Sequence, residues 1–203
     1  AVRNGEGIDE KSIKTAIEGS LKKLKTDYID LYQLHWPNRG SYHFRQNWNY
    51  NPTNQDTDLV KDNINGVLNA LSDLKKEGKI RHIGLSNETC WGASQFLDQL
   101  KNFSNLTIAS IQNEYSLLCR LYDLDMAEMS HHENISLLAY SPLAGGFLTG
   151  KYMENKVPDN SRLARVPSLF GRINDNSTLA VKEYVSLAKK YNFRFAQCVG
   201  IYI

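Results

Sequence analysis

The sequence predicts an α/β fold built on a parallel sheet, and two features of the chain lead to this prediction. Short apolar segments alternate with segments of helical periodicity, an order that produces βαβ units with parallel strands. The last three apolar segments begin near residues 80, 107 and 135, at spacings of 27 and 28 residues. A barrel of eight βα units averages about 31 residues per unit, so the spacing suits a barrel, although a doubly wound open sheet fits almost as well.

The composition is that of an ordinary globular protein and excludes several classes of partner. The chain has 203 residues, 41% of them hydrophobic and 23% charged, which favours one large domain with a real core. A net charge of +2 gives no reason to expect a nucleic acid or an anionic membrane as partner. No apolar run approaches the roughly 20 residues of a membrane span. Three scattered cysteines favour a reducing compartment, so we expect a cytoplasmic protein.

Five segments are predicted to be helices. The first follows Asp9, whose carboxylate can accept hydrogen bonds from the free amides of the first turn and so act as N-cap. Gly78 is placed to end the second, because glycine tolerates the left-handed conformation found after a helix. The predicted helices lie at about 9–24, 64–77, 93–100, 122–131 and 177–191.

Four segments rich in branched and aromatic residues are predicted to be strands, at 27–35, 80–86, 107–113 and 135–140. Pro37 stops the first, since proline cannot continue a strand interior. The loop that follows, residues 38–58, is long for a compact domain, and loops of this length are usually functional or disordered. It is unusually aromatic for a disordered linker.

Polar residues gather where each predicted strand ends, and ligands of parallel α/β folds bind at the carboxyl ends of the strands. The four ends carry Gln33, His35 and Trp36; Ser86, Asn87 and Glu88; Gln112, Asn113 and Glu114; and Tyr140 with Ser141. A glycine-rich stretch follows the last of them and reaches Lys151.

The chemistry of these groups suits a dinucleotide. The imidazole of His35 can donate to a developing oxyanion, and side-chain amides can read a carboxamide through paired donors and acceptors. A glycine-rich loop lets backbone amides approach a pyrophosphate, and Tyr140 offers a flat face to a flat ring. The chain has no Gly-x-Gly-x-x-Gly fingerprint, so a Rossmann site is not predicted.

Four segments resemble, in the right order, the motifs of the fourth to seventh strands of the aldo-keto reductase family. They are residues 27–37 (DYIDLYQLHWP), 78–87 (GKIRHIGLSN), 111–116 (IQNEYS) and 138–151 (LAYSPLAGGFLTGK). The similarity runs from about Asp9 to Gln197 and is greatest to the Tas-like NADP(H)-dependent oxidoreductases. It implies a (β/α)8 TIM barrel of which this chain supplies about four strands, so residues 1–203 are expected to form one barrel domain, incomplete at both ends.

The resemblance also implies a function and a set of site residues. The family reduces aldehydes and ketones to alcohols with NADP(H). His35 would be the catalytic histidine that orients the substrate carbonyl, and Trp36 and Trp48 would contact the substrate. Cofactor contacts would come from Ser86, Asn87 and Gln112 to the nicotinamide carboxamide, from Tyr140 by stacking, and from Ser141, Leu143, Gly145 and Lys151 along the pyrophosphate.

The family's catalytic Asp, Tyr and Lys come from strands before its fourth, and this chain has no candidate for them. Carbonyl reduction is therefore expected of the parent protein, while the chain itself is expected to lack the proton donor. The alternative is a cofactor-binding but non-catalytic interaction module, like the channel β-subunits of the family.

Several of these residues have purely structural interpretations as well. Ser86 and Asn87 would also serve as N-caps of the following helix, Gly145 as part of a plain turn, and Lys151 as a solvated surface residue. No metal site is expected, because the adjacent His131 and His132 point in different directions on a helix. Glu88 and Glu114 would suit a carboxylate pair for glycoside hydrolysis, but no third feature supports that activity.

Overall fold

The computed structural model describes residues 7–46 and 48–193. Contacts divide the chain into two compact units, and each is described by itself. Unit 1 runs as far as Asn113 and includes Asp125–Leu138, whereas unit 2 contains Glu114–Leu124 and the chain from Ala139 onward.

Unit 1 is built on a parallel four-stranded sheet whose spatial order, β1-β2-β3-β4, follows the order along the chain. The strands are β1 (Ile29–Leu34), β2 (Ile80–Ser86), β3 (Ile108–Gln112) and β4 (Ser136–Leu137). A doubly wound sheet reverses its strand order at a switch point, whereas a barrel adds each new strand beside the last. The order therefore confirms the barrel-type arrangement. β4 is shorter than the predicted 135–140, because only Ser136 and Leu137 pair with β3.

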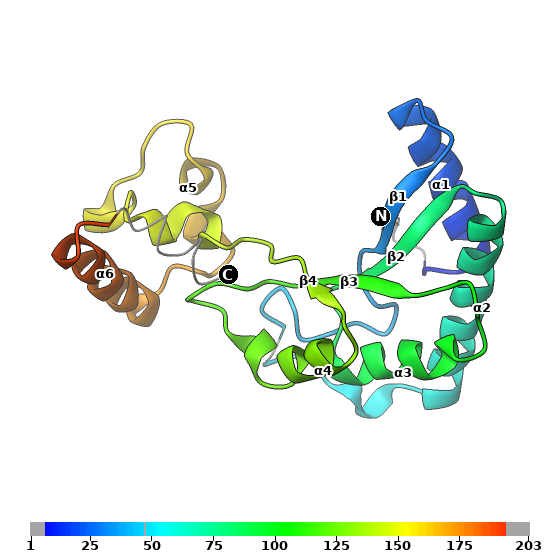
Figure 1. The fold of residues 1–203 in the computed structure, drawn as a ribbon. Helices are drawn as coiled ribbons and strands as arrows, with labels where there is room; N and C mark the ends of the chain where they lie inside the picture. Colours follow the sequence, from blue (N-terminus) through cyan, green and yellow to red (C-terminus); the bar gives the residue numbers. More distant parts are fainter. Residues whose placement is uncertain (1–6, 47, 194–203) are drawn as a thin grey trace. The chain divides into compact units, whose positions relative to one another are not determined.

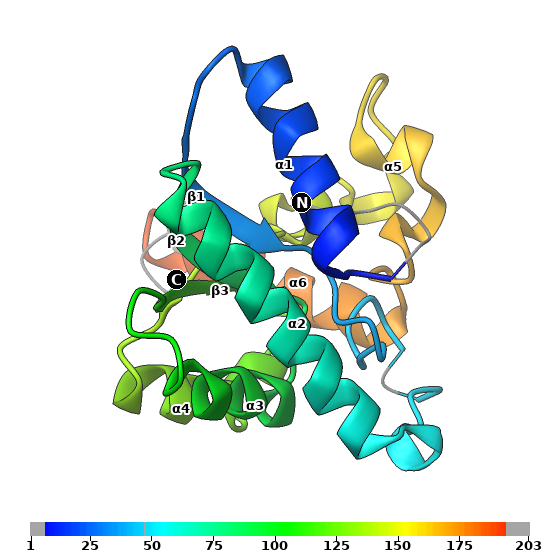
Figure 2. The same cartoon turned by 90° about the vertical axis from the view of Figure 1, so that its right-hand side faces the viewer.

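The helices of unit 1 lie along one side of this sheet (Figures 1 and 2). They are α1 (Glu10–Leu24), α2 (Thr57–Lys76), α3 (Cys90–Leu100) and α4 (Met126–His132), with a 3-10 turn at Pro52–Asn54. Asp9 caps α1 as predicted, in a capping box with Ser12. Gly78 has a φ of 75°, the left-handed conformation expected just beyond α2.

Apolar side chains between these helices and the strands form the core of unit 1. Leu68 and Leu71 of α2 are fully buried, as are Ile13 and Ile17 of α1, which packs against α2. Alternate strand residues point toward the helices, so Leu34 and Leu85 are also buried. The intervening residues, which include Gln33, face the other side of the sheet.

Unit 2 is made of short turns and one long helix. Its elements are the 3-10 turns Leu121–Asp123, Ala144–Thr149, Met153–Asn155 and Pro167–Leu169, the short α5 (Arg162–Arg165), and α6 (Asp175–Lys190). α6 confirms the helix predicted at 177–191. A separate core forms around Phe147, Leu148 and Val181. Within the described residues, no helix combines the length and apolar composition that crossing a bilayer requires.

Candidate active site at the carboxyl ends of the strands

The ends of β1, β2 and β3 bring four of the predicted site residues of unit 1 together. The side-chain amide of Asn87 donates to the backbone carbonyl of His35 at 2.8 Å and to the hydroxyl of Ser86 at 3.1 Å. The backbone N–H of Asn87 and the hydroxyl of Ser86 both donate to the carbonyl of Gln112, at 3.0 and 2.8 Å. His35, Ser86, Asn87 and Gln112 therefore form one hydrogen-bonded group across three neighbouring strands.

Asn87 is the centre of this group and has an uncommon backbone conformation. Its φ is 56°, in the left-handed region that asparagine tolerates better than most residues, and it is 1% exposed. This conformation ends β2 and turns the Asn87 side chain toward β1. The N-cap of α3 is Thr89, whose hydroxyl accepts from the Gly92 amide. The capping role considered for Ser86 and Asn87 is therefore filled by another residue.

The side-chain amide of Gln112 is available at the half-buried end of β3. Within the described ranges, the Gln112 backbone carbonyl accepts two hydrogen bonds while its side-chain amide forms none. An amide of this kind presents both a donor and an acceptor, which is the pair that a carboxamide needs. The residues at this edge therefore fit a nicotinamide carboxamide in their chemistry.

The two tryptophans predicted to contact substrate have different surroundings. Trp36 stacks on Phe44, with ring centroids 5.0 Å apart and an angle of 23° between the planes. Trp36 and Ser86 also line a cavity of about 370 Å³, together with apolar residues such as Leu34 and Leu85. Trp48, in contrast, is 91% exposed. The structure thus places Trp36 beside a cavity and Trp48 on the surface.

Glu88 and Glu114 are each bound to an arginine within their own unit. Arg39 forms an ion pair with Glu88 in unit 1, and in unit 2 the Arg172 Nε donates to Glu114 at 2.9 Å. Burial raises the pKa of the Glu88 carboxyl, and the Arg39 guanidinium partly opposes that shift. Neither carboxylate is arranged as half of an acid–base pair, so the glycoside-hydrolysis interpretation receives no support.

Sequence reasoning missed both arginines. The ion-pair partners are 49 and 58 residues apart in the chain, and no local motif connects them. Thr89 had a recognisable signal, because a threonine just before a helical segment is a common N-cap.

Unit 2 carries the remaining predicted cofactor residues, close together in sequence. Tyr140 pairs with Glu114 in an isolated parallel bridge, and Ser141 has a φ of 56° and accepts from the Ala144 amide through its carbonyl at 2.7 Å. The Leu143 carbonyl accepts from the Gly146 amide at 2.8 Å. These bonds fold the chain into consecutive tight turns.

Gly145 and Lys151 complete this segment. Gly145 has a φ of 70°, which a glycine adopts without strain, so its role in a turn is confirmed. The exposed Lys151 places its ammonium group 5.0 Å from the centroid of the Tyr152 ring. Turns rich in left-handed residues direct backbone amides into concave surfaces that suit phosphate oxygens. The segment therefore fits an anionic group in its chemistry.

No cluster of metal ligands occurs in the part of the chain that the structure describes. The rings of His131 and His132 lie 5.3 Å apart, edge to face.

Comparison with known proteins gives a consistent result. The sequence profile of the Aldo/keto reductase family matches residues 2–203. The chain is 41% identical to an aldo-keto reductase of Babesia bovis, over 95% of this chain and 70% of the relative. It is 37% identical to Protein tas of Escherichia coli, over 97% of this chain and 56% of that protein.

A solved structure is similar in fold. The glycerol dehydrogenase AKR11B4 from Gluconobacter oxydans superposes with a TM-score of 0.67 at 25% identity, covering 94% of this chain and 50% of that one. The chain thus spans between 50% and 70% of the length of these proteins.

Proposed function

Because the chain belongs to the aldo/keto reductase family, we propose that the protein containing it reduces aldehydes or ketones to alcohols with NADPH. The observation that carries the proposal is the group formed by His35, Ser86, Asn87 and Gln112 at adjacent strand ends. His35 contributes its backbone carbonyl to this group, and its imidazole is the side chain that can donate to a substrate carbonyl oxygen. The side-chain amide of Gln112 can read a carboxamide.

We assign the roles within unit 1 as follows. His35 orients the substrate carbonyl and stabilises the charge that develops on its oxygen. Asn87 and Ser86 hold the end of β2. The side-chain amide of Gln112, which forms no hydrogen bond among the described residues, binds the nicotinamide carboxamide. Trp36, beside its cavity, contacts the substrate, and Trp48 does so from the exposed part of the same loop. The nicotinamide, when bound, supplies the hydride.

The residues of unit 2 are assigned by themselves, to the binding of a dinucleotide. Tyr140 stacks on the flat ring, while Ser141, Leu143, Gly145 and Lys151 bind the pyrophosphate. The preference for NADPH over NADH is part of the proposal and rests on the family likeness. A cytoplasmic location is proposed from the cysteine usage, which Cys90 and Cys119 support because both are free thiols.

The test incubates the full-length protein with NADPH and an aromatic aldehyde. The reaction is measured as the decrease in NADPH absorbance. The His35→Ala variant is expected to lower kcat/KM by about 100-fold, because a preorganised donor to the oxygen is lost. Substituting NADH for NADPH should slow turnover if the cofactor preference is correct.

Two results would count against the proposal. If no carbonyl substrate causes NADPH oxidation and His35→Ala changes nothing, reduction of carbonyls is the wrong activity. Tight nucleotide binding without turnover, together with a stable protein partner, would instead favour the non-catalytic interaction module.

A further inference from the structure

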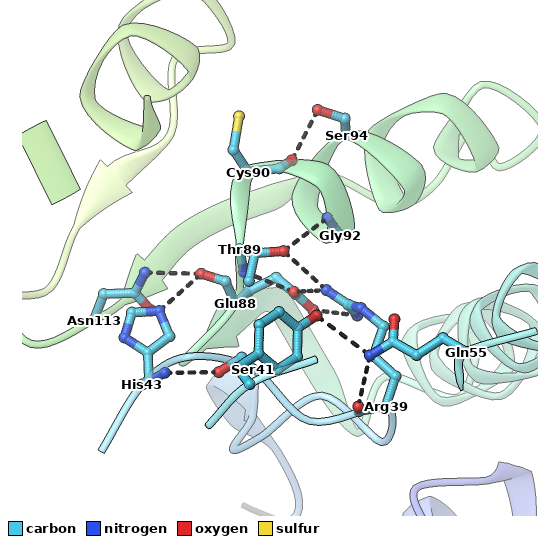
Figure 3. A network of polar contacts seen from close by, with 11 residues as sticks. Arg39, Ser41, His43, Gln55, Glu88, Thr89, Cys90, Gly92, Ser94 and Asn113 are labelled. Atoms are coloured by element: carbon cyan, nitrogen blue, oxygen red, sulfur yellow. Dashed lines mark hydrogen bonds and ion pairs between the residues drawn. The ribbon is translucent and has the colours of Figure 1, made fainter. Parts of the chain in front are cut away.

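Several side chains of the loop between β1 and α2, residues 35–56, converge on the end of β2 (Figure 3). Arg39 makes a two-pronged ion pair with Glu88, and the Nη1–Oε2 distance is 3.2 Å. The His43 Nε2 atom lies 3.1 Å from the backbone carbonyl oxygen of Glu88. The Gln55 side chain donates to the carbonyl of Arg39 at 2.9 Å. Arg39, His43 and Gln55 of the loop are therefore all bonded to Glu88 or to Arg39.

The ion pair is buried and closely surrounded. The side chains of Arg39 and Glu88 are only 5% and 3% exposed. Thr89 contributes two hydrogen bonds: its hydroxyl accepts from Arg39 at 3.1 Å, and its amide donates to Glu88 at 2.7 Å. A Cβ added at Gly92 would collide with both members of the pair. A buried pair usually adds little stability over apolar residues of the same size, which points to a role in geometry.

The backbone of Glu88 links this pair to the candidate active site. Asn87 precedes Glu88 directly, and its left-handed conformation aims its side-chain amide at the His35 carbonyl. On the other side, the Asn113 amide donates to the Glu88 carbonyl at 3.0 Å. Fixing the Glu88 side chain therefore restricts rotation of the peptide that sets the Asn87 conformation.

We propose that Arg39 and Glu88 are a positioning pair, which holds the 35–56 loop against β2 and keeps Asn87 aligned with His35. The inference rests on the proposed function, since that function gives His35 and Asn87 their parts in carbonyl and cofactor binding. Both side chains also line the cavity beside Trp36, but they are almost fully buried and are bonded to each other. Their effect reaches the chemistry through the loop and through Asn87.

Three variants of the full-length protein distinguish the effect of the geometry of the ion pair from the effects of its charge and of protein stability. Arg39→Lys keeps the charge but loses the planar fork that binds both carboxylate oxygens. Arg39→Met removes the partner and leaves a buried carboxylate. The double variant Arg39→Met with Glu88→Leu replaces the pair by apolar groups and is expected to fold as stably as the wild type. Arg81→Met is the matched control, because Arg81 pairs with Asp30 on the surface, at 56% and 70% exposure.

Three measurements are made on each folded variant: kcat and KM with NADPH and one aldehyde, the Kd for NADPH from tryptophan fluorescence, and the rate of chymotrypsin cleavage within residues 35–56. Chymotrypsin is suitable because Phe44 and Trp48 are exposed. Arg39→Lys and the double variant are expected to lower kcat/KM by about 10- to 100-fold, the usual effect of a misplacement of about 1 Å. Both should also weaken NADPH binding and speed cleavage, while Arg81→Met stays within about twofold of wild type in every measurement.

The inference would be overturned if the double variant melts like the wild type and also keeps the wild-type kcat/KM, Kd for NADPH and cleavage rate. The pair would then have only a structural role. Failure of the proposed function gives a different pattern. In that case the wild type turns over no carbonyl, yet cleavage of the loop and NADPH binding still report on the pair. Faster cleavage and weaker binding in the double variant would support the positioning role, and unchanged values would refute it.

Discussion

Gly92, in the first turn of α3, is the described glycine of unit 1 with the least room for a side chain. An added methyl group there would meet the guanidinium of Arg39 and the carboxylate of Glu88. We expect Gly92→Ala to destabilise the full-length protein by about 1–3 kcal/mol, the usual cost of overpacking a filled interior. Urea unfolding followed by circular dichroism measures the change in the free energy of unfolding.

Gly66 provides the matched control, because it is also helical, in α2, and has nothing within 4 Å of an added Cβ. Gly66→Ala is expected to stabilise the protein by roughly 0.5–1 kcal/mol through helix propensity. Equal effects of the two substitutions would show that the contact at Gly92 relaxes without cost.

Tyr32, in β1, should make stability depend on alkaline pH. It is 2% exposed, and its hydroxyl has no hydrogen-bond partner among the described residues. Burial raises the pKa of Tyr32 from 10.0 to about 12. The folded state therefore favours the neutral phenol over the phenolate. The stability that comes from this preference is fully present below pH 10 and is lost as the pH rises toward 12.

The Tyr32→Phe variant should therefore lose less stability between pH 10 and 12 than the wild type. At pH 7 it should be equal or slightly higher in stability, because an unpaired buried hydroxyl is removed. Thermal melts at a series of pH values test both points. Parallel curves for the two proteins would mean that the hydroxyl is paired or solvated in solution.

The positions of single site residues could be predicted from the sequence where a rule on neighbouring residues applies. Parallel strands end at one edge, so the grouping of His35, Ser86 and Gln112 followed from the strand boundaries alone. The same rules could not identify Arg39 or Arg172, because each binds a carboxylate about 50 residues away. Such pairings depend on the tertiary fold. No short motif in a single sequence indicates which arginine binds which carboxylate.

At the level of elements, the capping box of α1 makes a measurable contribution. The Asp9 carboxylate accepts from the Ser12 amide at 2.7 Å, and the Ser12 hydroxyl accepts from the Asp9 amide at 2.9 Å. We expect Asp9→Ala to lower the free energy of unfolding by about 1 kcal/mol. Asp62→Ala, at an exposed position within α2, should change it by less than about 0.5 kcal/mol or raise it slightly. A loss of the same size at both positions would point to general charge effects.

Element boundaries were predictable only where apolar residues mark them. α2 begins at Thr57, well before the predicted start near 64, since its first three residues are exposed and its fully buried residues begin only at Ile64. Asp56 begins the helix by accepting from the amides of Asp58 and Leu59. β4 was predicted too long because its sequence continues to look like a strand after pairing has stopped.

At the scale of the whole molecule, the sheet of unit 1 has an unpaired outer strand on each side among the residues that the structure describes. β1 and β4 are its edges, and a parallel sheet in this fold class is normally covered or closed. We expect residues 1–203, expressed alone, to aggregate and to lack a cooperative melt, as size-exclusion chromatography and calorimetry would show. A monomer with a sharp transition would contradict this expectation.

The global arrangement was only partly accessible from periodicity. Segment spacing allowed either a barrel or an open sheet, and the strand order β1-β2-β3-β4 decided for the barrel type. The division of contacts into two units had no signature in composition or linker sequence. The single barrel domain over residues 1–203 stays a prediction.

The contact of Gly92 with the Arg39–Glu88 pair also limits the routes by which these positions can evolve. A side chain at position 92 has no space while Arg39 is present. Loss of Arg39 alone leaves the buried carboxylate of Glu88 without its partner. The three positions therefore form an epistatic group in which most single steps are deleterious. Combinatorial mutagenesis with selection should recover larger residues at 92 almost entirely in backgrounds where the pair has already been replaced.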